Sequence, residues 1–209
     1  MSVTSRAPSE LPLTERQWVR RGELLEAARI VFERQGYHAA TVSAIVQAAG
    51  LSQGAFYLYF ADKKAVFAAL QEEMATLLRR RIYWATRAEQ NPARRLEAGL
   101  GAYFEFFEEY RAWNHRLMTE GLGIDPSFEA RQIALYETLA VAFRPTLIQL
   151  GAADPELAAA ALTGLGLQVA YSQHFQRQGK PAKPPAELAQ ECAQLFLYGA
   201  ARQPDGTRR

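Results

Sequence analysis

Cysteine and long apolar runs are scarce in this chain of 209 residues. Cys192 is the only cysteine, which excludes an intrachain disulfide and argues against a thiolate metal site within one chain. No apolar stretch long enough to cross a bilayer is free of charged residues. The N-terminus lacks a basic start followed by an apolar run, and Pro8 and Pro12 interrupt it, which disfavours a signal peptide. These absences predict a cytoplasmic protein without membrane contact.

Catalytic and metal-binding motifs are also absent. The histidines, His38, His115 and His174, are far apart and have no partner at a metal-ligand spacing. The segment Gly164-Leu165-Gly166 follows no strand pattern and lacks the third glycine of a dinucleotide-binding loop. Without a serine elbow, a phosphate-binding loop or paired cysteines, the sequence predicts no enzyme, no cofactor and no metal site.

A large excess of one charge is missing as well. The chain carries 24 Lys+Arg and 22 Asp+Glu, for a formal net charge of +2, which is too mild to identify a nucleic-acid-binding protein by itself. Residues 1–90 hold 12 basic and 9 acidic side chains, and residues 91–209 hold 12 and 13. The small positive excess therefore lies in the N-terminal part, and the function has to be inferred from motifs.

Helical periodicity, by contrast, runs through most of the chain. Thr14 and Gln17 fit a capping box, in which each side chain satisfies a backbone donor at the start of a helix. Gly36 ends that helix. A second helix begins near Thr41 and ends at Gly50, which can take the left-handed conformation of a tight turn.

Later helices are marked by capping residues and prolines. Asp62 is predicted to cap a long helix. The apolar stripe of this helix contains Val66, Phe67, Leu70, Met74, Leu77 and Leu78. Further starts lie at Asn91-Pro92, Asp125-Pro126, Asp154-Pro155 and Pro184-Pro185. Runs of alternating β-branched residues are absent, so the sequence predicts an all-α fold of about nine helices.

The strongest functional signal lies in residues 41–60. They read as two short helices joined by a glycine turn, with Ser52 as the cap of the second helix. The apolar face of the first helix is expected to meet Ala55 and Phe56 of the second. This is the layout of a helix-turn-helix, whose second helix lies in the major groove of DNA.

The outward positions of the second helix suit DNA recognition. Gln53 and Tyr57 are four residues apart and share a face. Glutamine can read a base edge with two hydrogen bonds, and Leu58 can touch a thymine methyl group. Gly54 has no side chain, so a phosphate or sugar can come close. Lys63 lies in the first turn of the next helix, where its charge joins backbone N–H groups that face a phosphate.

The stretch from Arg21 to about Leu70 resembles the DNA-binding domain of the TetR family of transcriptional regulators. The matching features hold their spacing together: Gln35-Gly36-Tyr37, Thr41-Val42, Ile45, Ala49-Gly50-Leu51-Ser52, Gly54, Phe56-Tyr57, Tyr59-Phe60 and Lys63. The first residues, 1–13, are rich in small, polar and proline residues and are expected to form a disordered arm. A helix-turn-helix DNA-binding domain is expected over residues 14–61. A helical domain for regulation, ligand binding and dimerisation would follow over residues 62–209.

The resemblance also implies roles for single residues. It implies phosphate contacts at Thr41, Ser43, Tyr59 and Lys63. It also implies that the groove-facing residues are Ser52, Gln53, Gly54 and Tyr57, and Leu58 is exposed next to them. The sequence departs from the family pattern at three positions. Val46 replaces the usual alanine, Ala55 replaces a common threonine and so removes a phosphate contact, and Leu58 argues against hydrogen-bonded readout at its position.

The last two helical stretches carry small and apolar stripes that predict a homodimer. The first stripe contains Ala161, Leu162, Leu165, Val169 and Ser172, and the second contains Leu188, Cys192, Leu195, Phe196 and Gly199. One helix-turn-helix buries too little surface for tight, specific DNA binding. A dimer places two such domains on two half-sites related by symmetry. Two helices from each subunit would form a four-helix interface, as the resemblance also implies. The alternative is that both stripes face only their own core.

Aromatic residues gather after residue 100 and predict a ligand pocket. The expected ligand-binding residues are Tyr103, Phe104, Phe107, Trp113, Tyr136, Tyr171 and Phe175, with polar groups among Tyr103, His115, Tyr136, Gln168 and His174. Aromatic stripes at helical spacing also fill ordinary cores, and the resemblance favours the pocket. Pro145 is expected to bend or break its helix and to open an entrance.

These features lead to one functional hypothesis and an alternative. The chain is expected to be a repressor that binds a pseudo-palindromic double-stranded operator as a homodimer and is released by a small, largely apolar ligand. Ligand binding would change the spacing of the two recognition helices through the long helix that begins at Asp62. The alternative is a DNA-binding regulator that answers to a protein partner or to no ligand.

Overall fold

The computed structural model of the protein describes residues 14–120, 123–176 and 181–199. These residues form nine α-helices, one π-helical turn and no strand, which confirms the predicted all-α fold. The helices are α1 (Glu15–Ala39), α2 (Val42–Ala49), α3 (Gln53–Tyr57), α4 (Lys63–Thr86), α5 (Pro92–Glu109), α6 (Arg111–Thr119), α7 (Pro126–Gln149), α8 (Pro155–Tyr171) and α9 (Pro185–Tyr198), with the π-helical turn η1 (Ser172–Gln176) directly after α8. No helix in the described ranges is long and apolar enough to cross a bilayer. The predicted arm, residues 1–13, lies outside those ranges.

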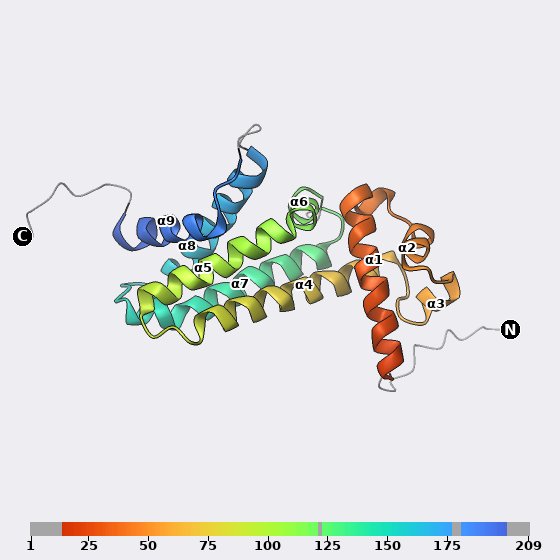
Figure 1. Ribbon diagram of the computed structural model, residues 1–209, viewed down its shortest axis with the longest axis horizontal. Coiled ribbons are helices and arrows are strands. Elements are labelled where there is room, and N and C mark those ends of the chain that lie inside the picture. The colour runs from red at the N-terminus through yellow and green to blue at the C-terminus, as the bar shows by residue number, and fades with distance from the viewer. Residues whose placement is uncertain (1–13, 121–122, 177–180, 200–209) are drawn as a thin grey trace, which may run out of the picture.

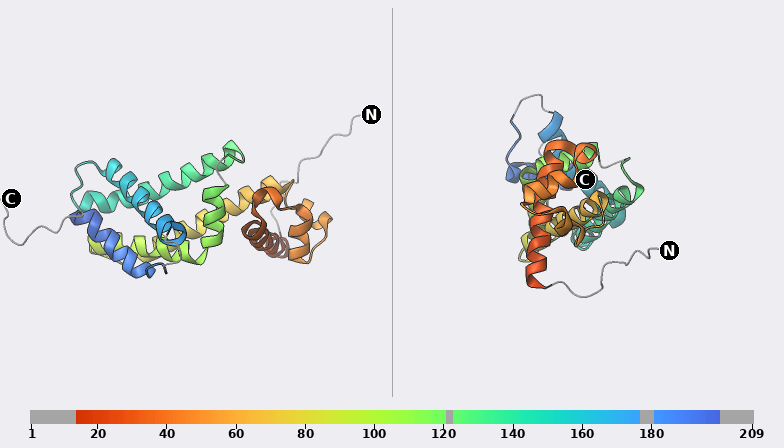
Figure 2. Two further views of the ribbon diagram at one scale, coloured as in Figure 1. Left: turned by 90° about the horizontal axis from the view of Figure 1, so that it is seen from above. Right: turned by 90° about the vertical axis from the view of Figure 1, so that its right-hand side faces the viewer.

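The molecule is elongated, and α1, α2 and α3 form one end of it (Figure 1). The long helix α4 leaves this end and runs beside α5 and α7 toward the other (Figures 1 and 2). At that far end α9 packs on α5, and α8 packs on α7. The short helix α6 lies against α1. Two elements, α4 and α6, therefore connect the helix-turn-helix end to the rest of the bundle.

Capping side chains set the helix starts where the sequence predicts them. Thr14 and Gln17 form both halves of the capping box that begins α1. Asn91, Asp125 and Asp154 each accept hydrogen bonds from backbone N–H groups of the first turn, and a proline follows each of them. The polar residue satisfies a donor that has no partner within the helix, and the proline has no donor to satisfy. Local chemistry alone therefore fixes these boundaries.

The boundary between α5 and α6 and the course of α7 differ from the sequence analysis. No start was predicted at Arg111, because Tyr110 caps α6 with its backbone only and offers no capping side chain. Of the bend or break predicted at Pro145, the break is wrong, since α7 continues through this residue to Gln149. The proline stands near the helix end, and its neighbours Thr146 and Leu147 are buried. Their packing offsets the lost backbone hydrogen bond.

An aromatic core joins the helix-turn-helix to the regulatory helices. Phe67 of α4 lies at its centre, with ring centroids 5.1 Å from Phe32 of α1, 4.7 Å from Phe128 of α7 and 5.3 Å from Trp113 of α6. All four side chains are buried. The predicted division at residues 61 and 62 therefore runs next to a shared core, so a change in the position of α6 or α7 is felt directly by α1.

Candidate DNA-binding and ligand-binding sites

The turn between α2 and α3 has the geometry of a helix-turn-helix. Gly50 ends α2 with φ 64° and ψ 30°, a left-handed conformation that glycine adopts without a side-chain clash. The Ser52 hydroxyl then accepts a hydrogen bond from Ala55 N at 3.2 Å and starts α3. Behind the turn, Ile45 and Phe56 have no exposed surface. The two short helices are therefore held as one unit by their apolar faces.

The opposite face of α3 is open to solvent. Gln53 and Gly54 are exposed, and the exposed fractions of Tyr57 and Leu58 are 57% and 73%. A tyrosine and a leucine with this exposure leave apolar surface in contact with water. A partner that covers this face of α3 would bury that surface. The exposure of these side chains leaves them free to contact DNA, and their place in the major groove stays a prediction.

Several residues of the helix-turn-helix that are predicted to contact DNA carry hydroxyl groups, among them Thr41, Ser43, Ser52 and Tyr59. Ser43 is exposed, and Thr41 Oγ1 accepts from Ala44 N at 3.1 Å as the N-cap of α2. A hydroxyl that accepts a backbone hydrogen bond keeps its own hydrogen to donate. Thr41 and Ser52 can therefore cap their helices and still donate to a phosphate. Tyr59 is half-buried beside them, and its phosphate role stays a prediction.

Lys63 has a structural position that the sequence does not indicate. Its ammonium group donates to the carbonyl oxygens of Tyr37 at 2.6 Å, His38 at 3.2 Å and Ala40 at 2.8 Å. These bonds occupy the three donors of a lysine and cap the C-terminal end of α1. Burial lowers the pKa of Lys63. The phosphate contact stays a prediction, and it would require Lys63 to give up part of this cap.

A cavity of about 130 Å³ lies among α4, α5, α6 and α7. Four of the predicted ligand-binding residues line it, namely Tyr103, Phe107, Trp113 and Tyr136. A further hollow of about 320 Å³ adjoins it between α4 and α7, and both share Thr138 and Leu139 as lining residues. An apolar pocket of this kind, walled by several helices of a bundle, is a common form of ligand site.

Three predicted ligand-binding residues lie outside this cavity. Phe104 is fully buried on the face of α5 that the core occupies. Tyr171 and Phe175 belong to an aromatic cluster at the end of α8, where the Phe175 ring centroid lies 5.4 Å from Tyr171 and 4.6 Å from His115. His174 stacks on Phe107 at 5.4 Å in the same cluster. These side chains support the wall behind Phe107, because aromatic type alone does not separate a pocket wall from the core behind it.

Polar groups inside the cavity include two that the sequence analysis missed. Gln71 of α4 has an exposed fraction of only 7%, and Asn114 of α6 also lines the cavity. The signal for Gln71 was its place in the apolar stripe of α4, four residues after Phe67 and three before Met74. Tyr103 and Tyr136 add two hydroxyl groups, and burial raises the pKa of both. All of these groups are uncharged at neutral pH.

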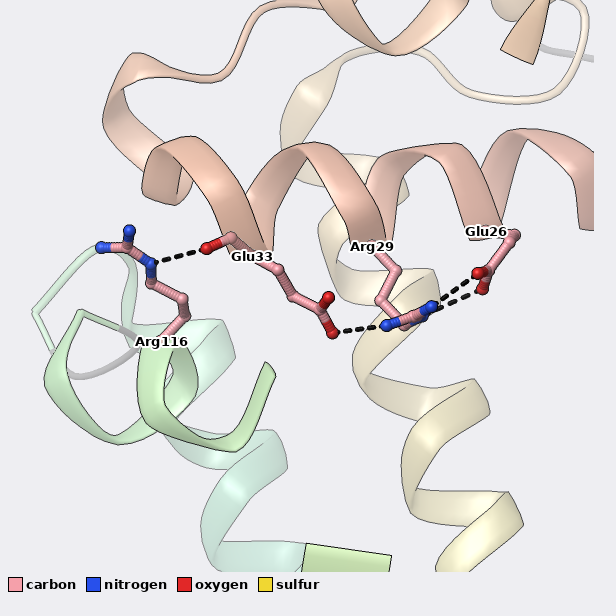
Figure 3. A network of polar contacts seen from close by, with 4 residues as sticks. All are labelled: Glu26, Arg29, Glu33 and Arg116. Carbon is pink, nitrogen blue, oxygen red and sulfur yellow. Dashed lines mark hydrogen bonds and ion pairs between the residues drawn. The ribbon is translucent and has the colours of Figure 1, made fainter. Parts of the chain in front are cut away.

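Helix α6 joins the cavity to the end of α1. Arg116 donates to the backbone oxygens of Glu33 at 3.2 Å and Arg34 at 3.4 Å. Figure 3 shows Arg116 reaching Glu33 from α6, beside a row of charged side chains on α1. Glu120 pairs with Arg116 and accepts from Tyr37 N at 2.9 Å. Since Asn114 stands on the same helix, a shift of α6 toward or away from the cavity also moves these contacts.

A second contact ties α7 to the start of α4. Lys64 Nζ lies 2.5 Å from Asp125 Oδ2, and Asp125 also accepts from Ser127 N as the N-cap of α7. The Lys64 ammonium and Ser127 hold the pKa of Asp125 at about 2. The pair lies immediately after the helix-turn-helix.

This low pKa predicts an acid-sensitive contribution to stability. Asp125 stabilises the fold fully above its ordinary pKa of 3.8, and the contribution is lost as the pH falls toward 2. Asp125→Asn keeps a capping oxygen but removes the charge. We expect the difference in unfolding free energy between wild type and this variant to shrink as chemical denaturation is repeated from pH 6 down to pH 3. A difference that stays constant over this range would show that the ion pair does not contribute.

The faces of α8 and α9 correct part of the predicted dimer stripe. Leu162, Leu188 and Cys192 have exposed fractions of 0%, 3% and 4%, so they face the core of their own chain. Ala161 and Leu195 of the predicted stripes are exposed, and with further exposed positions they form what we call the α8–α9 surface: Leu157, Ala161, Gly164, Gln168, Leu195 and Tyr198. On α8 these residues recur every three or four positions and so lie on one side of the helix. Leu157 and Tyr198 are 67% and 76% exposed.

Comparison with known proteins adds independent findings. Residues 24–70 match the family model of the bacterial regulatory proteins, tetR family. The chain is 31% identical over 194 residues to the uncharacterized HTH-type transcriptional regulator YdgC of Bacillus subtilis, which covers 86% of this chain and 91% of that protein. It is 33% identical over 142 residues to the HTH-type transcriptional repressor AcnR of Corynebacterium glutamicum, 68% of each chain.

Solved structures show the same fold. The transcriptional regulator FadR from Bacillus subtilis, solved in complex with stearoyl-CoA, superimposes with a TM-score of 0.72 and 19% identity over 86% of this chain and 99% of that chain. The relatives and structural neighbours are transcriptional regulators rather than enzymes.

Proposed function

Because the chain belongs to the tetR family of bacterial regulatory proteins, we propose that it is a transcriptional repressor that a small ligand releases from DNA. One observation carries the proposal: the exposed face of α3 and the cavity are joined through the same two helices, α4 and α6. Occupying the cavity bears on both helices and thereby on the orientation of α3. The protein acts in the cytoplasm, where its target DNA lies.

The repressor binds DNA as a homodimer formed through the α8–α9 surface. This surface combines exposed apolar side chains at Leu157, Leu195 and Tyr198 with small residues at Ala161 and Gly164. Small residues allow two helices to approach closely, and the apolar ones supply area to bury. Two α3 helices related by a twofold axis then read the half-sites of a pseudo-palindrome, with centres about 34–36 Å apart or a multiple of it.

Release follows from a change in the spacing of these two helices. A ligand in the cavity contacts α4 and α6, and α6 holds the end of α1 through Arg116 and Glu120. Rotation of the helix-turn-helix moves α3 out of register with successive major grooves, so affinity falls without the loss of any single base contact. A regulator controlled by a protein partner needs no internal cavity with polar groups, and the cavity favours the ligand.

The first experiment measures DNA binding directly. The purified protein is titrated into labelled duplexes from the region upstream of its own coding sequence, with fluorescence anisotropy as the readout. We expect one segment to bind far more tightly than random duplex, with an affinity that falls steeply as salt rises because phosphate contacts release counterions. Equal affinity for every duplex at all salt concentrations would contradict a sequence-specific repressor.

Substituting Gln53 tests the recognition face. Gln53→Ala removes a side chain that is exposed on α3 and has no structural partner to lose, so the fold is retained. We expect operator binding to weaken by about 1–3 kcal/mol and the preference at one base pair in each half-site to relax. Gln90→Ala is the control, because Gln90 is an exposed glutamine in the segment between α4 and α5. If Gln53→Ala leaves both affinity and sequence preference unchanged, α3 is not the element that reads the bases.

A further inference from the structure

Gln71 presents a buried acceptor to the cavity. Its Nε2 donates a long hydrogen bond to the backbone oxygen of Phe128 at 3.5 Å, which assigns the nitrogen to that side of the amide. Its Oε1 is buried and has no hydrogen-bond partner among the described residues. A buried polar atom without a partner has lost its hydrogen bonds to water and gained none in return. A glutamine in the apolar stripe of α4 is therefore costly to the fold unless something in the cavity donates to it.

Asn114 presents a buried donor to the same cavity. Its Nδ2 also has no partner in the part of the chain that the structure describes. The cavity that these two amides line is mainly apolar, with Met74, Leu78 and Trp113 among its residues, and it also contains the hydroxyl groups of Tyr103 and Tyr136. Among the described residues it therefore offers one unpartnered buried acceptor from α4 and one unpartnered buried donor from α6.

Charged side chains stay at the edge of the cavity. Arg79 pairs with Glu72 at 2.8 Å, and the two side chains are 33% and 65% exposed. Arg131 is exposed on α7. Among the described residues that line the cavity, the charged ones are Glu72, Arg79 and Arg131; the first two pair with each other and the third is exposed to solvent. A ligand ion at the buried amides would therefore lack a buried counter-ion, and burying an unpaired carboxylate or ammonium group is expensive. The group that meets Gln71 and Asn114 therefore has to be neutral.

The volume limits the part of the ligand that carries this group. At about 130 Å³, the cavity is close to the engineered cavity of about 150 Å³ that binds benzene. It therefore accommodates about one ring next to the amides. An apolar extension of the ligand has room in the adjoining hollow of about 320 Å³.

We propose that the cavity selects an uncharged ligand with a carboxamide or lactam group, whose N–H donates to Gln71 Oε1 and whose carbonyl accepts from Asn114 Nδ2. This proposal names the ligand class for the site in the proposed function and rests on that function only for its effect on DNA. Such a group satisfies both amides at once and pulls α4 and α6 toward a common ligand.

Three probes of one shape test the chemistry. Benzamide carries the donor and the acceptor, benzoate carries two acceptors and a charge, and α-methylstyrene carries neither. Binding to the full-length protein is measured by isothermal titration calorimetry. We expect benzamide to bind at least about tenfold more tightly than either of the others, since each lacks a needed hydrogen bond or brings an unpaired charge. Benzoate binding as tightly as benzamide, or no binding of benzamide at millimolar concentration, would overturn the proposal.

Variants assign the effect to the two amides. Gln71→Leu and Asn114→Leu should each weaken benzamide binding about tenfold and strengthen α-methylstyrene binding, which reverses the selectivity. Gln132→Leu is the matched control, because Gln132 lines the same cavity but its Nε2 already donates to the Tyr136 hydroxyl at 2.5 Å. Thermal melts verify that each variant is folded. If Gln71→Leu fails to fold, the selectivity of Asn114→Leu tests the proposal. Unchanged selectivity in a folded variant would show that the two amides do not bind the ligand.

Failure of the proposed ligand class can be distinguished from failure of the proposed function. Operator affinity is measured with and without saturating benzamide in the same preparations. Selective benzamide binding with no change in operator affinity supports the ligand class and contradicts ligand-induced release. Tight operator binding with no selectivity among the probes supports the DNA-binding function and contradicts the ligand class.

Discussion

Gly164→Glu is expected to convert the protein to a monomer and to weaken operator binding by at least about 10³-fold, because a single head retains little more than non-specific affinity. Gly164 lies in the middle of the exposed face of α8, and an added Cβ meets nothing within 4 Å in its own chain. The substitution therefore leaves the subunit fold intact. In a close helix contact, however, it buries an unpaired carboxylate at the twofold interface, which is strongly unfavourable. Analytical ultracentrifugation and anisotropy on the same samples measure both effects.

Two controls separate the interface from general effects of the substitution. Gly164→Ala adds only a methyl group and improves helix propensity by about 1 kcal/mol, so the dimer should persist. Ala130→Glu adds the same charge at an exposed position of α7 and should leave the dimer intact. If Gly164→Glu remains dimeric at micromolar concentration with full operator affinity, the α8–α9 surface is not the interface.

Arg116→Met is expected to uncouple the two sites. The substitution removes the contacts of α6 with the backbone of Glu33 and Arg34 and the partner of Glu120, but it does not alter the cavity lining. Coupling between two sites typically changes affinity by about 5- to 150-fold. We expect this factor to fall to near unity in the variant, with ligand affinity itself unchanged within about threefold. Titrating benzamide into the protein–operator complex and into free protein gives the factor in both directions.

Arg111→Met serves as the matched control for this experiment. Arg111 is an exposed arginine in the first turn of the same helix, so its removal changes the same charge without touching α1. The control should couple as the wild type does. If Arg116→Met retains the full coupling factor, the Arg116 contacts do not carry the signal, and α4 or the packing of Phe128 of α7 against α1 carries it instead.

Local chemistry explains why much of the fold is predictable. A capping side chain followed by proline identifies the starts of α5, α7 and α8 without any tertiary information. The turn at Gly50 and the buried Phe56 follow from spacing in the same way. The start of α6 is not predictable by these means, because Tyr110 makes no side-chain capping hydrogen bond. That start depends on packing against α1, which no local signal reports.

Side-chain roles are less predictable where one residue type suits two environments. Lys63 suits a phosphate, yet the structure places its ammonium group on the end of α1. Leu162 and Leu188 suit a dimer interface, yet the two helices turn these positions inward. Packing against neighbouring helices decides whether an apolar helix face points into the core or toward the surface. The sequence shows only that the helix has an apolar face.

Selection of binding sites from random duplex DNA with the purified wild-type protein shows whether the protein is a dimeric repressor. In such a dimer, two identical α3 helices read the DNA. The enriched sequences should contain two inverted half-sites whose centres lie about 10–10.5 base pairs apart or at a multiple of that distance. Each selected duplex should bind a whole number of dimers. Enrichment of a single unrepeated motif bound by one subunit, or no enrichment over random DNA, would contradict the account.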